Sequence, residues 1–261
     1  MNRRFKLARV TTVMFCFAAV LPAGERIYAQ RVSSEGTSER SAGSEHAAEA
    51  RTKPESPKSV GYQEAFVDLY KQLGRYYPCF ELKGIDWQAV GEEMLPRVNQ
   101  IDTDREFGLL CLQLVARLED SHAWVQKGSA ELPELPIPRW DPGLACLLDD
   151  RNKPVVYYLD QDGPAERAGV KKGMTVLSIN GKPAESAINE CMEQISKYTG
   201  YSSKRYLKYQ AVRRFARQMH KGANVVLEME GLDGNKSTFK LPATLGNRYL
   251  PRLPVPIKGI T

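Results

Sequence analysis

Hydrophobic residues between positions 62 and 118 recur at the three- and four-residue spacing of amphipathic helices. This spacing predicts a first helix over residues 62–78, which Pro78 ends because its ring blocks further helical hydrogen bonding. Two more helices are predicted, with Asp86 and Thr103 as their N-caps. The apolar face of the first helix consists of Phe66, Leu69, Tyr70 and Leu73. We therefore expect a small helical bundle over residues 59–130.

Short apolar and β-branched runs separated by turn residues follow over residues 138–245, a pattern typical of a small sheet domain. Asn180-Gly181 is a strong hairpin signal, and residues 184–222 return to helical spacing. The predicted strands are 143–148, 155–159, 175–179, 225–229 and 238–241. The expected class is α+β: a small N-terminal helical bundle, then a β-barrel or sandwich with a helical insertion.

The first 29 residues have the layout of a secretory signal peptide. Arg3, Arg4 and Lys6 precede an apolar stretch over Val10–Val20. An uncleaved membrane anchor is the alternative, but no apolar run reaches the roughly 18 residues of a good membrane span. We expect an exported protein, periplasmic or extracellular, without a stable membrane span.

Residues 30–58 and 246–261 flank the two predicted domains and lack hydrophobic periodicity. The first segment is rich in Ser, Glu, Ala, Gly and Thr, so it buries too little apolar surface to offset its chain entropy. We expect a disordered linker there and a Pro-rich tail after residue 245.

Composition excludes several classes of protein. With 42% hydrophobic and 26% charged residues, the chain is neither wholly disordered nor collagen-like. The net charge is +6, of which residues 1–29 contribute +4 (five basic residues and Glu25), leaving +2 for the rest. A basic, tyrosine-rich segment over residues 198–221 also carries an apolar stripe, so its charges are expected on the solvated face of a helix. We therefore predict no nucleic-acid binding.

Cysteines and histidines give little sign of a metal or cofactor. Outside the signal segment the cysteines are Cys79, Cys111, Cys146 and Cys191. Three disulfide pairings are possible, although Cys111 and Cys146 lie in apolar runs that favour buried thiols. The three histidines are far apart in the sequence, so we expect no metal site and no cofactor.

Ser121 and His122 lie where the third helix runs into a predicted strand over Ala123–Val125. Side chains at such a junction can point into a cleft, and a histidine held by a hydrogen bond can act as a general base. The alternative is a capping serine beside an ordinary polar histidine.

The segment 163–181, Gly-Pro-Ala-Glu-Arg-Ala-Gly-Val-Lys-Lys-Gly-Met-Thr-Val-Leu-Ser-Ile-Asn-Gly, resembles the signature of bacterial PDZ domains, with Met174 where that family usually has Asp. The resemblance implies a PDZ-like domain over residues 138–245 that binds a peptide carboxylate on backbone amides. The peptide would then add as a strand beside Leu144–Leu148. The implied binding residues are Gly143, Leu144, Ala145 and Cys146. The alternative is a PDZ fold that braces a neighbouring domain and binds nothing.

The order of a helical module, a Ser-His junction and a PDZ-like domain resembles the S41 family, the carboxyl-terminal processing and tricorn-type serine peptidases. Tyr76-Tyr77-Pro78, Ile85-Asp86-Trp87 and residues 118–125 carry this resemblance, together with the PDZ-like segment. It implies that His122 is a catalytic base and that Ser121 belongs to the surrounding hydrogen-bond network. The family's catalytic core should follow with the nucleophilic serine, but only Leu245–Thr261 remain and no Gly-x-Ser-x-Gly occurs.

Three interpretations follow. The chain is an inactive, truncated relative of S41 peptidases, or a stand-alone PDZ adaptor that binds protein C-termini, or a chain that pairs in trans with a catalytic core. The expected partners are unfolded or C-terminal peptide segments of exported proteins. We expect no peptidase activity from this chain alone, because transition-state stabilisation needs a nucleophile and an oxyanion hole.

Overall fold

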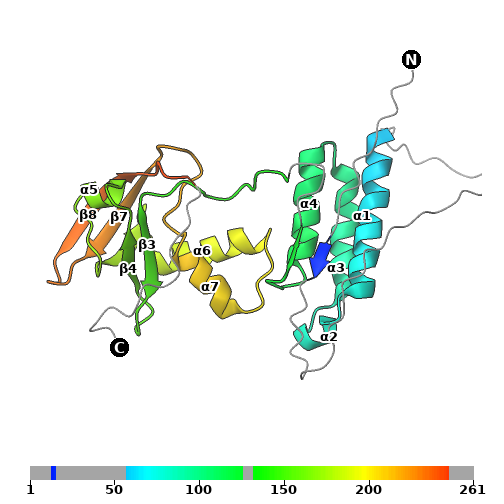
Figure 1. The fold of residues 1–261 in the computed structure, drawn as a ribbon, viewed down its shortest axis with the longest axis horizontal. Coiled ribbons are helices and arrows are strands. Elements are labelled where there is room, and N and C mark those ends of the chain that lie inside the picture. The colour runs from blue at the N-terminus through cyan, green and yellow to red at the C-terminus, as the bar shows by residue number, and fades with distance from the viewer. Residues whose placement is uncertain (1–12, 16–56, 126–131, 247–261) are drawn as a thin grey trace, which may run out of the picture.

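The computed structural model describes residues 13–15, 57–125 and 132–246, and Figure 1 shows them as a helical bundle beside a sheet domain. Both helices and an antiparallel sheet are present, which confirms the α+β class. The predicted linker and tail lie almost entirely outside the described residues, as does the predicted signal segment except for Val13–Phe15.

The bundle follows the predicted order of helices and ends in a short strand. Asp86 caps α3 by accepting a hydrogen bond from the Ala89 amide at 3.0 Å, and Thr103 and Glu106 form a reciprocal capping box at the start of α4. Strand β2 pairs antiparallel with β1. The elements are β1 (Val13–Phe15), α1 (Pro57–Tyr76), α2 (Phe80–Lys83), α3 (Trp87–Met94), η1 (Leu95–Gln100), α4 (Asp104–Ala116) and β2 (Ala123–Val125).

The sheet domain is antiparallel and its strands run in the order β3-β4-β5-β7-β8, with β6 paired to β5. The sheet is open, with β3 and β8 at its edges, so the predicted barrel is not confirmed. The elements are β3 (Leu144–Leu148), β4 (Pro154–Leu159), α5 (Pro164–Arg167), β5 (Thr175–Ile179), β6 (Lys182–Pro183), α6 (Ala184–Ser196), α7 (Lys204–Val212), β7 (Asn224–Glu230) and β8 (Lys236–Pro242).

The predicted hairpin at Asn180-Gly181 is confirmed. Both residues have positive φ, 50° and 79°, and Ile179 pairs with Lys182 across the turn. Asn and Gly tolerate this left-handed conformation better than other residues, which is why the dipeptide directs the chain back on itself here.

The predicted helical stretch 184–222 forms two helices, α6 and α7, which lie between the sheet and the bundle in Figure 1. The connection between them passes close to the end of the bundle. A Cβ atom on Gly200 would lie 2.7 Å from the Asp120 backbone nitrogen, so only glycine permits this approach.

Each part has its own hydrophobic core. Leu114 and Leu73 are buried in the bundle, and Leu227 and Val156 are buried in the sheet domain, in separate clusters. The four cysteines outside the signal segment are free thiols, and Cys111 and Cys146 are buried as predicted. None of the helices described is long and apolar enough to cross a membrane.

Candidate active site

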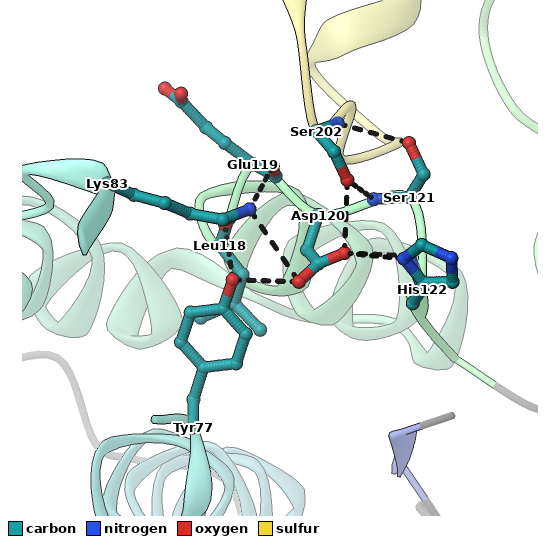
Figure 2. Close-up of polar contacts among 8 residues, drawn as sticks. All are labelled: Tyr77, Lys83, Leu118, Glu119, Asp120, Ser121, His122 and Ser202. Atoms are coloured by element: carbon teal, nitrogen blue, oxygen red, sulfur yellow. Dashed lines mark hydrogen bonds and ion pairs between the residues drawn. The ribbon is translucent and has the colours of Figure 1, made fainter. Parts of the chain in front are cut away.

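The candidate site is the Asp120-Ser121-His122 turn between helix α4 and strand β2 (Figure 2). Leu118, fully buried, anchors the chain at the end of the helix. Glu119 follows in the left-handed region with φ of 48°, which ends the helical path. The turn therefore exposes Ser121 and His122, while the Asp120 side chain before them is 17% exposed.

The Asp120 carboxylate is the centre of the hydrogen-bond network in Figure 2. Its Oδ1 accepts from the His122 backbone amide at 2.9 Å and lies 3.2 Å from the ring Nδ1 of the same histidine. Its Oδ2 accepts from the Tyr77 hydroxyl at 2.9 Å and lies 3.6 Å from the Lys83 ammonium group. Ser202, from the connection between α6 and α7, donates its hydroxyl to Oδ1 at 3.2 Å.

These contacts keep Asp120 ionised at neutral pH. Burial acts to raise the pKa of Asp120, but the hydrogen bonds from His122 and Tyr77 and the charge of Lys83 outweigh it and lower the pKa to about 2. Burial, followed by the bond to this carboxylate, raises the pKa of Tyr77, so its hydroxyl remains a proton donor.

His122 is held at one ring nitrogen and open at the other. Its side chain is 65% exposed. Because ionised Asp120 only accepts hydrogen bonds, the contact assigns the proton of neutral His122 to Nδ1. The Nε2 lone pair then has no hydrogen-bond partner among the described residues and can accept a proton from a substrate or nucleophile.

Ser121, the second predicted site residue, is turned toward the sheet domain. Its hydroxyl accepts from the Ser202 amide at 3.0 Å, and its own amide donates to the Ser202 hydroxyl at 3.0 Å. The hydrogen bonds that connect the Ser121 side chain with the His122 ring thus pass through Ser202 and Asp120. This reciprocal pair of hydrogen bonds also joins the bundle to the sheet domain.

Sequence reasoning missed four residues of this network: Tyr77, Lys83, Asp120 and Ser202. Asp120 had a local signal, because a carboxylate two residues before a histidine can bond both its amide and its ring. Tyr77 and Ser202 lie 43 and 82 positions from Asp120 in the sequence, so no local pattern connects them with it.

The predicted peptide-binding residues lie together at the start of the edge strand β3. Gly143 has φ of 95°, and Leu144, Ala145 and Cys146 are buried. The amides of Gly143 and Leu144 both donate to the carboxylate of Asp141. Among residues 57–125 and 132–246, no group of three or more His, Cys, Asp or Glu side chains could hold a metal ion.

Comparison with protein families finds one match in the bundle: residues 61–116 match the family model of the tricorn protease C1 domain. The matched stretch runs from α1 to the end of α4, and it ends four positions before Asp120. No curated protein matches the chain.

Among solved structures, mature CPAF complexed with lactacystin is 11% identical, with a TM-score of 0.49; the match covers 75% of this chain and 36% of CPAF. The photosystem II D1 C-terminal processing protease is 19% identical over 69% of this chain and 43% of its own, with a TM-score of 0.26. The chain thus spans about a third of the length of CPAF. The family match links the helical bundle to tricorn-type proteases, the S41-like relationship that the sequence motifs indicate.

Proposed function

We propose that this chain supplies the acid–base half of an S41-like serine-peptidase centre. His122 is the general base and Asp120 orients its ring. The observation that carries the proposal is the contact of 3.2 Å between Nδ1 and an ionised carboxylate, on a ring whose Nε2 is exposed. The match of the preceding helices to the tricorn protease C1 domain supports the assignment of this turn to a hydrolytic site.

In this reaction Nε2 of His122 takes the proton of a serine hydroxyl while the serine oxygen attacks the amide carbon of a peptide. Asp120 stabilises the imidazolium that forms, which then gives its proton to the leaving amine. No described serine hydroxyl contacts Nε2, and the Ser121 hydroxyl is engaged with Ser202. We therefore place the nucleophile outside the described residues or on a partner chain, and expect this chain alone, an exported protein, to be inactive.

The tautomer of His122 tests the base assignment directly. In ¹⁵N NMR spectra of the full chain between pH 7 and 8, we expect His122 to be protonated mainly at Nδ1. The exposed His220, for which no contact with a carboxylate of the described residues is seen, provides an internal control. Substitution Asp120→Ala should shift His122 toward the Nε2-protonated form and leave the His220 signals unchanged. A wild-type His122 protonated at Nε2 would contradict the assignment.

Peptidase activity tests the second half of the proposal. Purified full chain should neither cleave casein nor react with a fluorophosphonate probe, which labels activated serines. Turnover that His122→Ala abolishes would show that the chain holds a complete centre. That result would contradict the proposal that this chain supplies only the acid–base half of the centre. His122 would remain the general base. Ser121→Ala is the matched control, because its hydroxyl faces Ser202 and not the ring.

A further inference from the structure

The loop that leads into β3 already contains a bound carboxylate, and it belongs to the protein itself. Asp141 is 1% exposed and is the most deeply buried charged residue in the part of the chain that the structure describes. Its Oδ1 accepts from the amides of Gly143 at 2.8 Å and Leu144 at 3.3 Å. Two adjacent backbone N–H groups that converge on one oxygen form an anion-binding arrangement.

A buried cation completes this arrangement. The Arg217 side chain is 9% exposed, and its Nε lies 3.2 Å from Oδ2 of Asp141. Burial lowers the pKa of Arg217, and the charge of Asp141 opposes that shift. A buried guanidinium without a carboxylate would be strongly unfavourable. Two backbone amides and one cation are thus among the groups that contact this single carboxylate.

Backbone pairing holds both partners in place. The amide and carbonyl of Trp140 bond the carbonyl and amide of Gln218 at 3.0 and 2.7 Å. The amide and carbonyl of Asp141 bond Leu245 in the same way, at 2.7 and 3.1 Å. The segments that carry Asp141 and Arg217 are thus fixed to each other and to the chain after β8.

Strand β3 also packs against a helix. Helix α7 packs against both β3 and α6 (Figure 1). Side chains from α7 and the following turn are buried in one cluster with Leu144 and Cys146 of β3 and with Ile188 of α6. These side chains are Ala211, Val212, Phe215 and Ala216. A peptide strand added at β3 would therefore lie beside a strand that already packs against α7.

We propose that Asp141 is an internal substitute for the carboxylate of a peptide C-terminus. The site itself, made of the Gly143 and Leu144 amides and Arg217, recognises carboxylates. In the folded chain it is occupied from within, and α7 packs against the adjacent strand β3. The chain in this state is therefore closed to protein C-termini, and a stand-alone adaptor would need Asp141 to leave. This proposal is independent of the role of His122.

Chemical rescue tests the site. The variant Asp141→Ala removes the internal carboxylate and leaves both amides and Arg217. We expect sodium acetate to raise the thermal unfolding temperature of this variant by several degrees and to shift the NMR signals of the Gly143 and Leu144 amides. Acetamide and equal concentrations of sodium chloride should do neither. Wild type and Asp141→Asn, which keeps an acceptor oxygen in place, should not respond to acetate.

Peptide binding to the wild type tests whether the folded chain is closed to protein C-termini. Fluorescent decapeptides of random sequence with a free C-terminus should bind no better than the same peptides with an amidated C-terminus. A preference of about tenfold or more for the free carboxylate, equivalent to about 1.4 kcal/mol, would overturn the proposal. So would a folded Asp141→Ala protein that responds equally to acetate and acetamide.

If Asp141→Ala does not fold in plain buffer, circular dichroism spectra in acetate and in acetamide test whether a carboxylate restores the fold. Folding in acetate alone supports the carboxylate site, and failure to fold in both overturns it.

Discussion

Two aspartates in this protein make the same local contact in opposite surroundings. Asp120 and Asp141 each accept a hydrogen bond from the backbone amide two residues later, at 2.9 and 2.8 Å. The Asp120 side chain is 17% exposed and holds a histidine whose side chain is 65% exposed. Asp141 is 1% exposed and is paired with the buried Arg217.

The difference shows that burial of the partner, and not the turn itself, decides what such a carboxylate can do. At Asp120 the partner is exposed, so its second ring nitrogen can take part in proton transfer. At Asp141 both the carboxylate and its partner Arg217 are almost fully buried, so the carboxylate acts as an internal ligand. Substitutions and pH can test this contrast, and the largest effect is expected at the buried carboxylate.

Removal of the buried carboxylate should have the largest effect on stability. Asp141→Ala leaves the charge of Arg217 buried and unpaired, so we expect the free energy of unfolding to fall by roughly 3–5 kcal/mol. Urea unfolding followed by circular dichroism measures this loss. Asp149→Ala is the matched control, because Asp149 also accepts from two backbone amides, of Arg151 and Lys153, but at an exposed turn. The free energy of unfolding of Asp149→Ala should fall by about 1 kcal/mol. Equal losses for the two variants would show that burial of the carboxylate does not matter.

Substitutions in the two hydrophobic cores test whether bundle and sheet domain unfold separately. Leu114→Ala and Leu227→Ala each remove a fully buried side chain and should cost about 3 kcal/mol. Because the cores are separate clusters, each variant should shift only one of two calorimetric transitions. A single transition shifted equally by both variants would show that the two parts unfold as one unit.

Asp120 should make the stability of the bundle depend on acidic pH. Its pKa in the folded protein is about 2, below the roughly 3.9 of an unperturbed aspartate. The stabilisation is therefore fully present above about pH 5 and is lost as the pH falls through 2. Asp120→Asn should lower the free energy of unfolding by about 1 kcal/mol at pH 7, with a difference from wild type that shrinks as the pH falls from about 5 to 2.

The exposed helix residue Asp68 provides the control for this pH dependence. Urea unfolding of Asp68→Asn at pH 7, 4 and 2 should follow the wild type at each pH. A difference for Asp120→Asn that is constant from pH 7 to pH 2 would show that the carboxylate charge is not responsible.

Loss of the contact between the bundle and the sheet domain should have the smallest effect on stability. Ser202→Ala removes the hydroxyl that bonds Asp120 and the Ser121 amide, at a cost of about 0.5–1 kcal/mol. Hydrogen exchange of the Ser121 amide should become faster, while Ser196→Ala, on the exposed end of α6, should leave it unchanged. An unchanged Ser121 amide in Ser202→Ala would contradict the role of this hydroxyl as its acceptor.

Local chemistry fixes much of the fold without any tertiary information. Asp86, Thr103 and Asn180-Gly181 act through bonds to residues within a few positions, so their caps and hairpin were predictable. The exposed position of His122 at a helix-to-strand junction was predictable for the same reason. Sequence spacing also predicted most strands, because each shows its own run of apolar residues.

How these elements come together into sites depends on the tertiary structure. Tyr77, Lys83 and Ser202 reach Asp120 from distant parts of the chain, and Arg217 reaches Asp141 across 76 positions. The open sheet and the packing of α7 against β3 likewise depend on how the elements meet. The physical reason is that hydrogen bonds and burial depend on distance in space, whereas a sequence pattern reports only neighbours along the chain.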